Sequence, residues 1–201
     1  MASKSDEAAL ALYVNIMEEV KGRAFGINTI TQSQIAIGPP LIREYCFLQL
    51  RMLCELIALG CLVAHGDITK TKYFQRDAYK ADDILRRLEE LHPEFYPFPV
   101  TPIFNPGHIH LEPITSGFLT KAELISLYGR CGDILHKGTL DLLISPRPWR
   151  MDYTDIGEWG QKILNLLSSH RISRIGGRFH MVVFLEHIPS GGNVHAAIAE
   201  N

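Results

Sequence analysis

The chain has 201 residues, of which 46% are hydrophobic and 21% are charged, and its formal net charge at pH 7 is -2. This composition is ordinary for a soluble globular protein of one sizeable domain, or of one domain with a small appendage. The near-neutral charge excludes a global basic field that binds nucleic acid non-specifically, so any nucleic-acid contact must be local.

The hydrophobic pattern predicts helices over the first half of the chain. A first helix is expected over residues 6–22, followed by a weaker apolar segment that ends at Gly38-Pro39-Pro40. Residues 40–65 form the clearest element, because they are apolar around most of the helix circumference, which is typical of the centre of a bundle. A further helix is expected over residues 71–91, where His92-Pro93 stops it.

The second half of the chain mixes irregular segments with two more helices. Residues 93–117 are rich in proline and aromatic residues and predict a packed connection, with a short strand at 108–112. Thr120 and Glu123 form a capping box that begins a helix ending near Gly138. Residues 145–150 are expected to be a linker, and 155–170 another amphipathic helix.

Alternating apolar residues near the end of the chain predict a β-hairpin, with residues 189–192 as its turn. A four-residue loop there would place Glu186 opposite His195. Because a lone hairpin is marginally stable in water, it must pack on the helices, pair with a strand at 108–112, or pair with another copy.

These elements predict an α+β fold, mostly α, in which a four- or five-helix bundle carries a C-terminal β-hairpin. The expected division is a helical bundle over 1–175, which includes the proline-rich connection 93–117, and a hairpin appendage over 176–201. The appendage would pack on the bundle or on a partner.

The chain is expected to be cytoplasmic and not to bind a membrane. Residues Met1–Glu7 lack the basic start and apolar run of a signal peptide. The most apolar segment, 46–64, carries Gln49, Arg51 and Glu55, which favours a buried helix over a membrane span. The cysteines form no CxxC pair and are expected to be reduced and mostly buried: Cys46, Cys54, Cys61 and Cys131.

The most informative stretch runs from Gly129 to Gly138, because it combines two helix-weakening glycines with reactive side chains. Arg130 and His136 lie about 9 Å apart along a helix and about 120° apart around it. Asp133 lies between them, three residues from each. Histidine can move a proton near neutral pH, and arginine can hold a phosphate, which suffices for metal-free RNA cleavage by the 2′-hydroxyl.

An arginine followed after five residues by a histidine, late in a helical bundle, resembles the HEPN superfamily (higher eukaryote and prokaryote nucleotide-binding). The resemblance covers the helix pattern of residues 40–170, and its specific part is Arg130-x5-His136. It implies a metal-independent RNase or nucleotide-binding protein whose composite site forms across a homodimer. His136 would be the acid or base, Arg130 the phosphate ligand and Asp133 the orienting residue. The chain departs from the usual pattern at Cys131, where family members carry a polar residue.

Two further groups of polar residues accompany this motif. Arg51 and Glu55, together with Glu44, fall on one stripe of the helix over 40–65, either as a solvent-facing strip or as a polar seam facing a cleft. A basic segment later in the chain could bind phosphates, with Trp149, Trp159 and Phe179 available to stack on bases. Its cationic residues are Arg147, Arg150, Lys162, Arg171, Arg174, Arg178 and His180.

Alternatives to the RNase hypothesis remain open at this stage. In a non-catalytic helical interaction protein, Arg130 would pair with Asp133 and His136 would cap its helix. In a small metalloenzyme, His108 and His110, together with Glu112, would share one face of a strand and bind a metal. A thiol nucleophile would have to be Cys131. The leading hypothesis requires no cofactor and no metal, and its partners are a second copy of the chain and RNA or a nucleotide.

Overall fold

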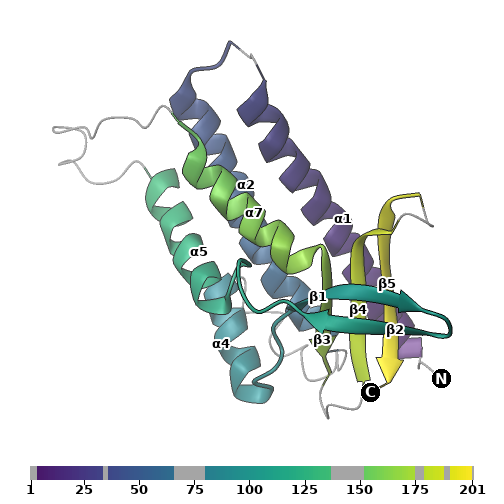
Figure 1. Cartoon of the computed structure of the whole chain (residues 1–201). Coiled ribbons are helices and arrows are strands. Elements are labelled where there is room, and N and C mark those ends of the chain that lie inside the picture. The colour runs from purple at the N-terminus through teal and green to yellow at the C-terminus, as the bar shows by residue number, and fades with distance from the viewer. Residues whose placement is uncertain are drawn as a thin grey trace.

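A computed structural model describes residues 4–33, 36–65, 80–136, 152–174, 179–187 and 191–200. It has an α+β fold that is mostly helical, as predicted, with an antiparallel five-stranded sheet (Figure 1). The described helices are α1 (Lys4–Gln32), α2 (Pro39–Ala64), α4 (Ala81–Leu91), α5 (Lys121–Leu135) and α7 (Thr154–Leu167). The strands are β1 (Phe98–Asn105), β2 (His108–Pro113), β3 (Ser169–Ser173), β4 (Phe179–His187) and β5 (Asn193–Glu200). The predicted linker 145–150 lies outside the described residues.

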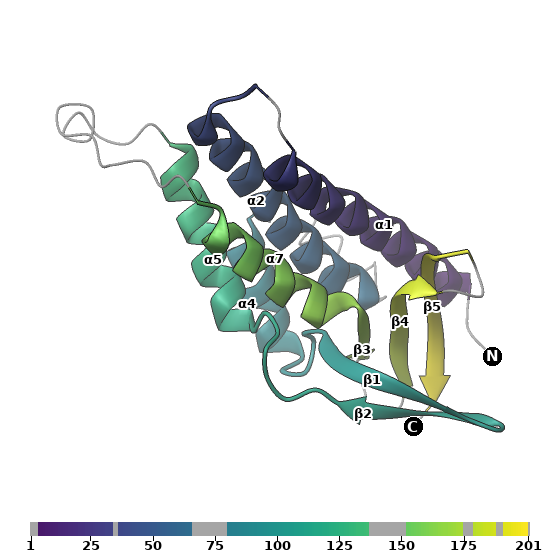
Figure 2. The ribbon, with the colours of Figure 1, turned by 45° about the horizontal axis from the view of Figure 1, so that its top comes forward.

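Helix α2 lies at the centre of the helical layer, where α1, α4, α5 and α7 all contact it. The helices run alongside one another and the sheet lies at one end of them (Figure 2). Because α2 is apolar around most of its circumference, it can bury side chains against every neighbour. By length and composition α2 could also cross a membrane, although it is mostly buried inside the structure.

Helix α1 is longer than predicted, and the expected boundary near residue 22 was wrong. Its buried positions Tyr13, Met17, Val20 and Ile27 continue the helical period beyond Gly22. The glycines within α1 weaken the helical pattern in the sequence. Packing against α2 outweighs their cost in helix propensity, which is about 1 kcal/mol per glycine. Helix α7 is shorter than predicted, since β3 begins at Ser169.

The expected hairpin exists, but the structure corrects its surroundings. The strand order is β2-β1-β3-β4-β5, so β4 is paired on one side with β5 and on the other with β3. The boundary expected between residues 175 and 176 therefore falls inside one sheet. The predicted strand at 108–112 is confirmed as β2, whose partner is β1 and not the hairpin. In Figure 1 the β1–β2 hairpin crosses β4, and Phe104 lies 6.5 Å from Phe184, measured between ring centroids.

The expected pairing of Glu186 with His195 was wrong. His195 lies opposite Phe184, and His187 pairs with Asn193, with a register irregularity between Phe184 and His187. Gly191 and Gly192 have φ angles of 76° and 81°, a region that favours glycine and turns the chain into β5. A strand irregularity is not encoded by simple alternation, which explains the error.

Helix α1 is joined to the last strands by polar contacts. Lys21 donates to the carbonyl of Gly192 at 2.8 Å, and the Val194 N–H donates to Glu18 at 2.6 Å. Arg174 pairs with Asp6 at 2.6 Å. The sheet is thus held against the first helix as well as against the end of α7.

Two glycine-to-alanine substitutions are expected to have opposite effects on stability. A Cβ at Gly60 would lie 3.2 Å from the ring of fully buried Tyr13, whereas a Cβ at Gly160 meets nothing within 4 Å. Gly160→Ala should therefore raise the free energy of unfolding by about 0.5–1 kcal/mol. Gly60→Ala should lower it by roughly 1 kcal/mol, because overpacking outweighs helix propensity. Urea unfolding checks both, and two changes of the same sign would contradict the packing described.

Candidate functional site

A buried carboxylate on α7 holds two arginines from two other helices. Asp155 accepts from Arg43 through both oxygens, at 3.0 and 2.8 Å, and from Arg130 at 2.7 Å. Arg43 also donates to the carbonyl of Asp152 at 2.7 Å. Asp155 and Arg43 are each only 7% exposed, and their hydrogen bonds raise the pKa of Arg43. This ion triad joins α2, α5 and α7.

The triad fixes Arg130 while leaving part of it accessible. Its Nη2 is bound to Asp155, and its guanidinium lies 5.6 Å from the centroid of the Phe47 ring. The Arg130 side chain is nevertheless 41% exposed, and its other two nitrogens have no acceptor among the described residues. Because an arginine has five N–H donors, Arg130 can bind an anion without leaving Asp155.

The two other motif residues, Asp133 and His136, are exposed. His136 ends α5, where its backbone N–H donates to the carbonyl of Gly132 at 3.0 Å. Asp133 pairs with neither Arg130 nor any other described residue. The carboxylate that orients Arg130 is thus Asp155 and not Asp133. The expected capping of the helix end by His136 is made by its backbone.

Cys131, between these residues, is fully buried. Burial raises the pKa of its thiol to about 12, so it stays protonated near neutral pH and is no nucleophile. All four cysteines are buried, as predicted, and none is in a disulfide.

The polar stripe on α2 faces α5. Arg51 bonds Glu55 at 3.3 Å and the hydroxyl of Tyr128 at 3.1 Å, and that hydroxyl donates to Glu55 at 3.3 Å. The Arg51 guanidinium also lies 4.7 Å from the centroid of the Tyr128 ring. Arg51 and Glu55 therefore form a half-buried network that joins α2 to α5. Arg51 and Glu55 thus contact the motif helix, and their assignment as a polar seam facing a functional cleft stays a prediction.

No family model matches the chain. Comparisons with curated proteins and with solved structures also give no match. The resemblance to the HEPN superfamily therefore rests on Arg130, His136 and the helix pattern around them, and the function must be argued from the side chains.

The predicted basic segment does not gather around the motif. Arg147, Arg150 and Arg178 lie outside the described residues. Arg171 lies on β3, where its guanidinium is 5.5 Å from the centroid of the Phe98 ring. Arg174 is paired with Asp6. Since α7 separates Asp155 from β3 by about 20 Å, Arg171 and Arg174 belong to the other end of the molecule.

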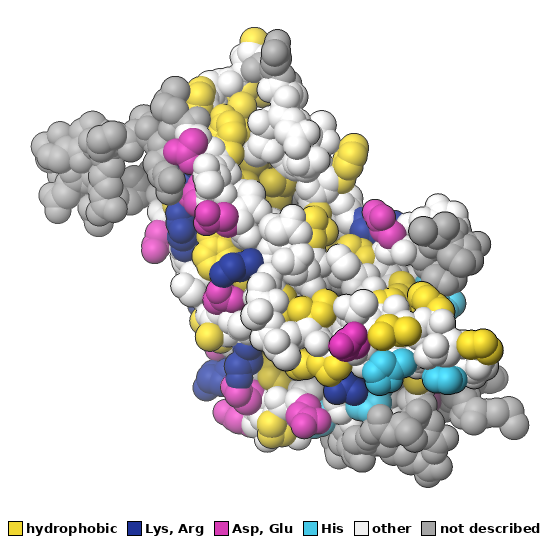
Figure 3. All heavy atoms as spheres, in the orientation of Figure 1, with side chains coloured by type: hydrophobic (Ala, Val, Ile, Leu, Met, Phe, Trp, Pro, Cys, Tyr) yellow, Lys and Arg dark blue, Asp and Glu magenta, His cyan; other side chains and the backbone are white. Residues whose placement is uncertain are grey.

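The histidines proposed as metal ligands lie on β2. His108, His110 and Glu112 alternate along this strand and are exposed. Figure 3 shows histidine side chains gathered at the sheet end of the molecule. Among the residues that the structure describes, no group of three or more His, Cys, Asp or Glu side chains is placed to hold a metal ion.

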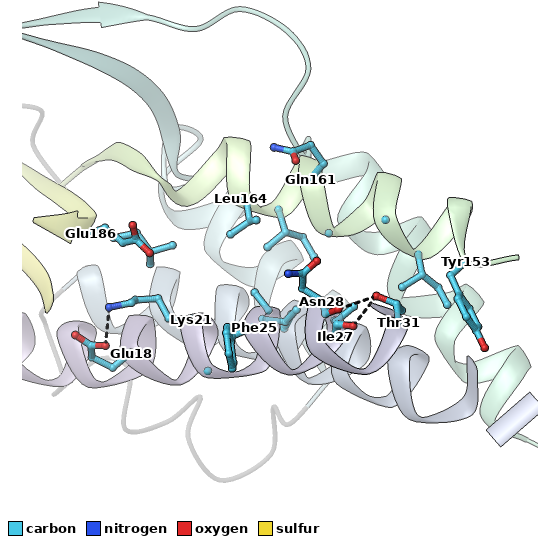
Figure 4. Close-up of a pocket in the computed structure, with 18 residues that line it drawn as sticks. Glu18, Lys21, Phe25, Ile27, Asn28, Thr31, Tyr153, Gln161, Leu164 and Glu186 are labelled. Carbon is cyan, nitrogen blue, oxygen red and sulfur yellow. Dashed lines mark hydrogen bonds and ion pairs between the residues drawn. The ribbon is translucent and has the colours of Figure 1, made fainter. Parts of the chain in front are cut away.

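A pocket with a volume of about 710 Å³ lies between α1 and α7 (Figure 4). Its lining is mostly apolar and includes Leu53, Ile163 and Leu164, while Lys21 and Gln161 stand near its edges. Neither Arg130 nor His136 lines it. The pocket is thus separate from the motif surface.

The roles of Arg43 and Asp155 could not be predicted from the sequence. Both lie among buried residues at the start of a helix, so the periodicity assigned them to ordinary amphipathic faces. One feature of the sequence does indicate a buried charge, because Arg43 falls on the same apolar stripe as Phe47 and Leu50. A charged residue on a buried stripe requires a charged partner, and the sequence does not show which one.

Proposed function

We propose that the chain is a HEPN-like, metal-independent RNase or nucleotide-binding protein that acts as a cytoplasmic homodimer, with its site at the C-terminal end of α5. The observation that carries the proposal is the state of Arg130, whose guanidinium is anchored by a buried carboxylate and is still 41% exposed beside an exposed histidine. A fixed, accessible guanidinium is what phosphate recognition requires, because little entropy is lost on binding.

In this proposal Arg130 binds the non-bridging oxygens of a phosphodiester, and His136 removes the proton from the neighbouring 2′-hydroxyl. The 2′-oxygen then attacks phosphorus and the bond to the 5′-oxygen breaks. The products are a 2′,3′-cyclic phosphate and a 5′-hydroxyl, which takes its proton from water. Asp155 keeps Arg130 in position, and Asp133 contributes negative charge near His136.

The proposed dimer would bring two copies of the motif together along α5, on the exposed side of a four- or five-helix bundle. Gly129 supports this arrangement, because a Cβ there would meet nothing within 4 Å, so packing among the described residues does not require glycine at this position. The absence of a side chain would allow another helix backbone to approach closely. The second copy would supply the histidine or arginine that one chain alone holds about 9 Å away.

An RNA-degradation assay in excess EDTA tests this proposal. The wild type should cleave single-stranded RNA to products with cyclic phosphate ends, and His136→Ala should lower the rate at least about 100-fold through loss of the acid or base. His108→Ala is the matched control, because His108 is an exposed histidine far from α5. Absence of cleavage by the wild type, loss of cleavage in EDTA, or full activity of His136→Ala would each contradict the RNase proposal.

One observation favours a second function, that of a non-catalytic interaction protein. The ion pair of Arg130 with Asp155 and its contact with Phe47 would stabilise the packing of α5 on α7 in any case. In that function Arg130→Gln lowers stability, and RNA is neither bound nor cut. Measuring unfolding and RNA binding on the same Arg130→Gln sample separates the two functions.

A further inference from the structure

Strands β3 and β4 carry buried core residues on one face and several polar residues on the other face. Their inward residues His170, Ile172, Met181 and Val183 are all fully buried. Because side chains alternate along a strand, the residues between these positions point away from that core. On this outer face Ser173 lies directly opposite His180, and Arg171 lies two residues before Ser173.

This outer face forms part of a pocket of about 380 Å³. The volume is within the range of about 300–1,000 Å³ that is usual for small-molecule sites. Arg171, Ser173 and His180 line it from the sheet, and Thr120 and Lys121 line it from the start of α5. The remaining walls are Glu94 and a set of ring side chains from the segment before β1, the start of β1 and the segment before α5: Pro93, Tyr96, Pro97, Phe98 and Phe118.

Hydrogen-bonding groups in this pocket lack partners. Both ring nitrogens of His180 and the hydroxyl oxygen of Ser173 are buried with no hydrogen-bond partner among the described residues. Arg171 contacts the Phe98 ring and forms no ion pair or hydrogen bond with a described residue. Leaving a buried polar group unpaired costs about 1–3 kcal/mol, so these two buried side chains beside the unpaired guanidinium of Arg171 indicate a bound group absent from the chain itself.

The strand register places these groups at the spacing of a single anion. Arg171 and Ser173 are neighbours on one strand face, and His180 is diagonal to Arg171 across the ladder. Such neighbours lie roughly 7–8 Å apart at their Cβ atoms, and the side chains can converge between them. Arginine has only donors, serine has a hydroxyl that can donate, and histidine can donate from a ring nitrogen. The set therefore fits an acceptor with several oxygens, as a phosphate has.

We propose that this pocket binds a mononucleotide, with its phosphate on Arg171, Ser173 and His180 and its base against Phe98 and the neighbouring aromatic rings. The charges agree with an anion, since two cationic residues, Arg171 and Lys121, face one acidic residue, Glu94. Lys121 is bonded to Glu89, so Arg171 provides the principal unneutralised charge. The flat apolar walls agree with a base, because aromatic rings and a guanidinium both stack on bases.

This site is independent of the surface proposed for RNA cleavage. It lies at the N-terminal end of α5, and His136 follows the C-terminal end of the same 15-residue helix, which corresponds to about 20 Å. No residue of the Arg43–Asp155–Arg130 triad lines the pocket. The proposal can therefore succeed or fail separately from the RNase activity.

Isothermal titration of the full chain with AMP, adenosine and inorganic phosphate tests the proposal. AMP should bind the wild type at least about tenfold more tightly than adenosine or phosphate alone, because it uses both parts of the pocket. Arg171→Gln should weaken AMP binding at least about tenfold. Ser173→Ala should weaken it several-fold without lowering the thermal midpoint, since this hydroxyl has no partner to lose in the ligand-free protein.

Arg86→Gln is the matched control, because Arg86 is an exposed arginine on α4 that does not line the pocket. His136→Ala should retain full AMP affinity, which separates this site from the one at the other end of α5. Three results would overturn the proposal: no AMP binding by the wild type, equal affinity for AMP and either of its parts, or unchanged AMP binding in both Arg171→Gln and Ser173→Ala.

Discussion

Asp155→Ala is expected to lower the free energy of unfolding by about 3–5 kcal/mol, the largest effect of any single substitution considered for this chain. The carboxylate is the acceptor for both Arg43 and Arg130, and Arg43 is only 7% exposed. Removing Asp155 leaves the Arg43 guanidinium buried without a counter-charge, which costs far more than the loss of an exposed ion pair. Urea unfolding monitored by circular dichroism measures the difference.

The control for this experiment is Asp83→Ala, which removes an exposed carboxylate paired with Arg86 on α4. It should change stability by less than about 1 kcal/mol. A double variant, Arg43→Met with Asp155→Leu, should recover much of the loss, because an apolar pair leaves no buried charge. A loss for Asp155→Ala no larger than that for Asp83→Ala would show that the triad is not buried as described.

Mild acid is expected to destabilise the protein through its buried histidines. His170 is fully buried, and burial lowers its pKa to about 4. Its Nδ1 lies 2.9 Å from the carbonyl of Leu167, which only accepts, so Nδ1 carries the proton. Nε2 is then left to accept from the hydroxyl of Tyr13 at 2.7 Å. A second proton would break this contact inside the core.

His65 adds to the same effect. It is 6% exposed, neither ring nitrogen has a hydrogen-bond partner in the part of the chain that the structure describes, and its ring centroid lies 5.1 Å from that of His92. Burial first, and then the charges of His92 and Arg174, lower the pKa of His65 to about 4. Both histidines are therefore neutral in the folded chain at pH values where the unfolded chain binds protons.

The direction of this pH dependence follows from the number of protons that the folded and unfolded states bind. Between pH of about 6.5 and about 4 the unfolded state holds more protons than the folded state, so stability falls as the pH falls through this window. Each histidine contributes about 3 kcal/mol across the window. Stability is fully present above the unfolded pKa and is lost progressively below it.

Urea unfolding at a series of pH values from 7.5 to about 4 measures this dependence. His170→Gln should reduce the slope of stability against pH, because glutamine cannot take up the proton, whereas His108→Ala on the exposed strand β2 should leave the slope unchanged. A slope in His170→Gln equal to that of the wild type would contradict the assigned role of His170.

Much of the fold could be predicted because the signals were local. The all-round apolar character of α2, the capping box of α5 and the alternation in β4 each lie within one segment and are confirmed in the structure. Strand β1 was missed because Pro99 and Pro102 argue against a strand. Both prolines lack an N–H, and β1 tolerates them in a ladder with β2 and only a short pairing with β3.

The candidate site could be predicted only in part. Arg130 and His136 are recognisable because they lie close together in the sequence. The carboxylate that holds Arg130 is 25 residues away, and Arg43 is 112 residues from that carboxylate. Spacing in the sequence predicted Asp133 as the carboxylate that orients Arg130. The carboxylate that Arg130 contacts in the structure depends instead on how α2, α5 and α7 pack. The pocket around Arg171 likewise depends on strand register.

The contacts between α1 and the last strands bear on the order in which the chain can fold. Glu18 accepts a hydrogen bond from the N–H of a residue 176 positions later, and Tyr13 on α1 bonds His170 on β3, 157 positions later. During synthesis α1 can pack on α2 early, but one side of it stays exposed to solvent until β5 has left the ribosome. Contacts of such large sequence separation slow folding, so the native packing of α1 is completed only after β5 has been synthesised. A chain stalled before β5 would present that side of α1 to chaperones and proteases.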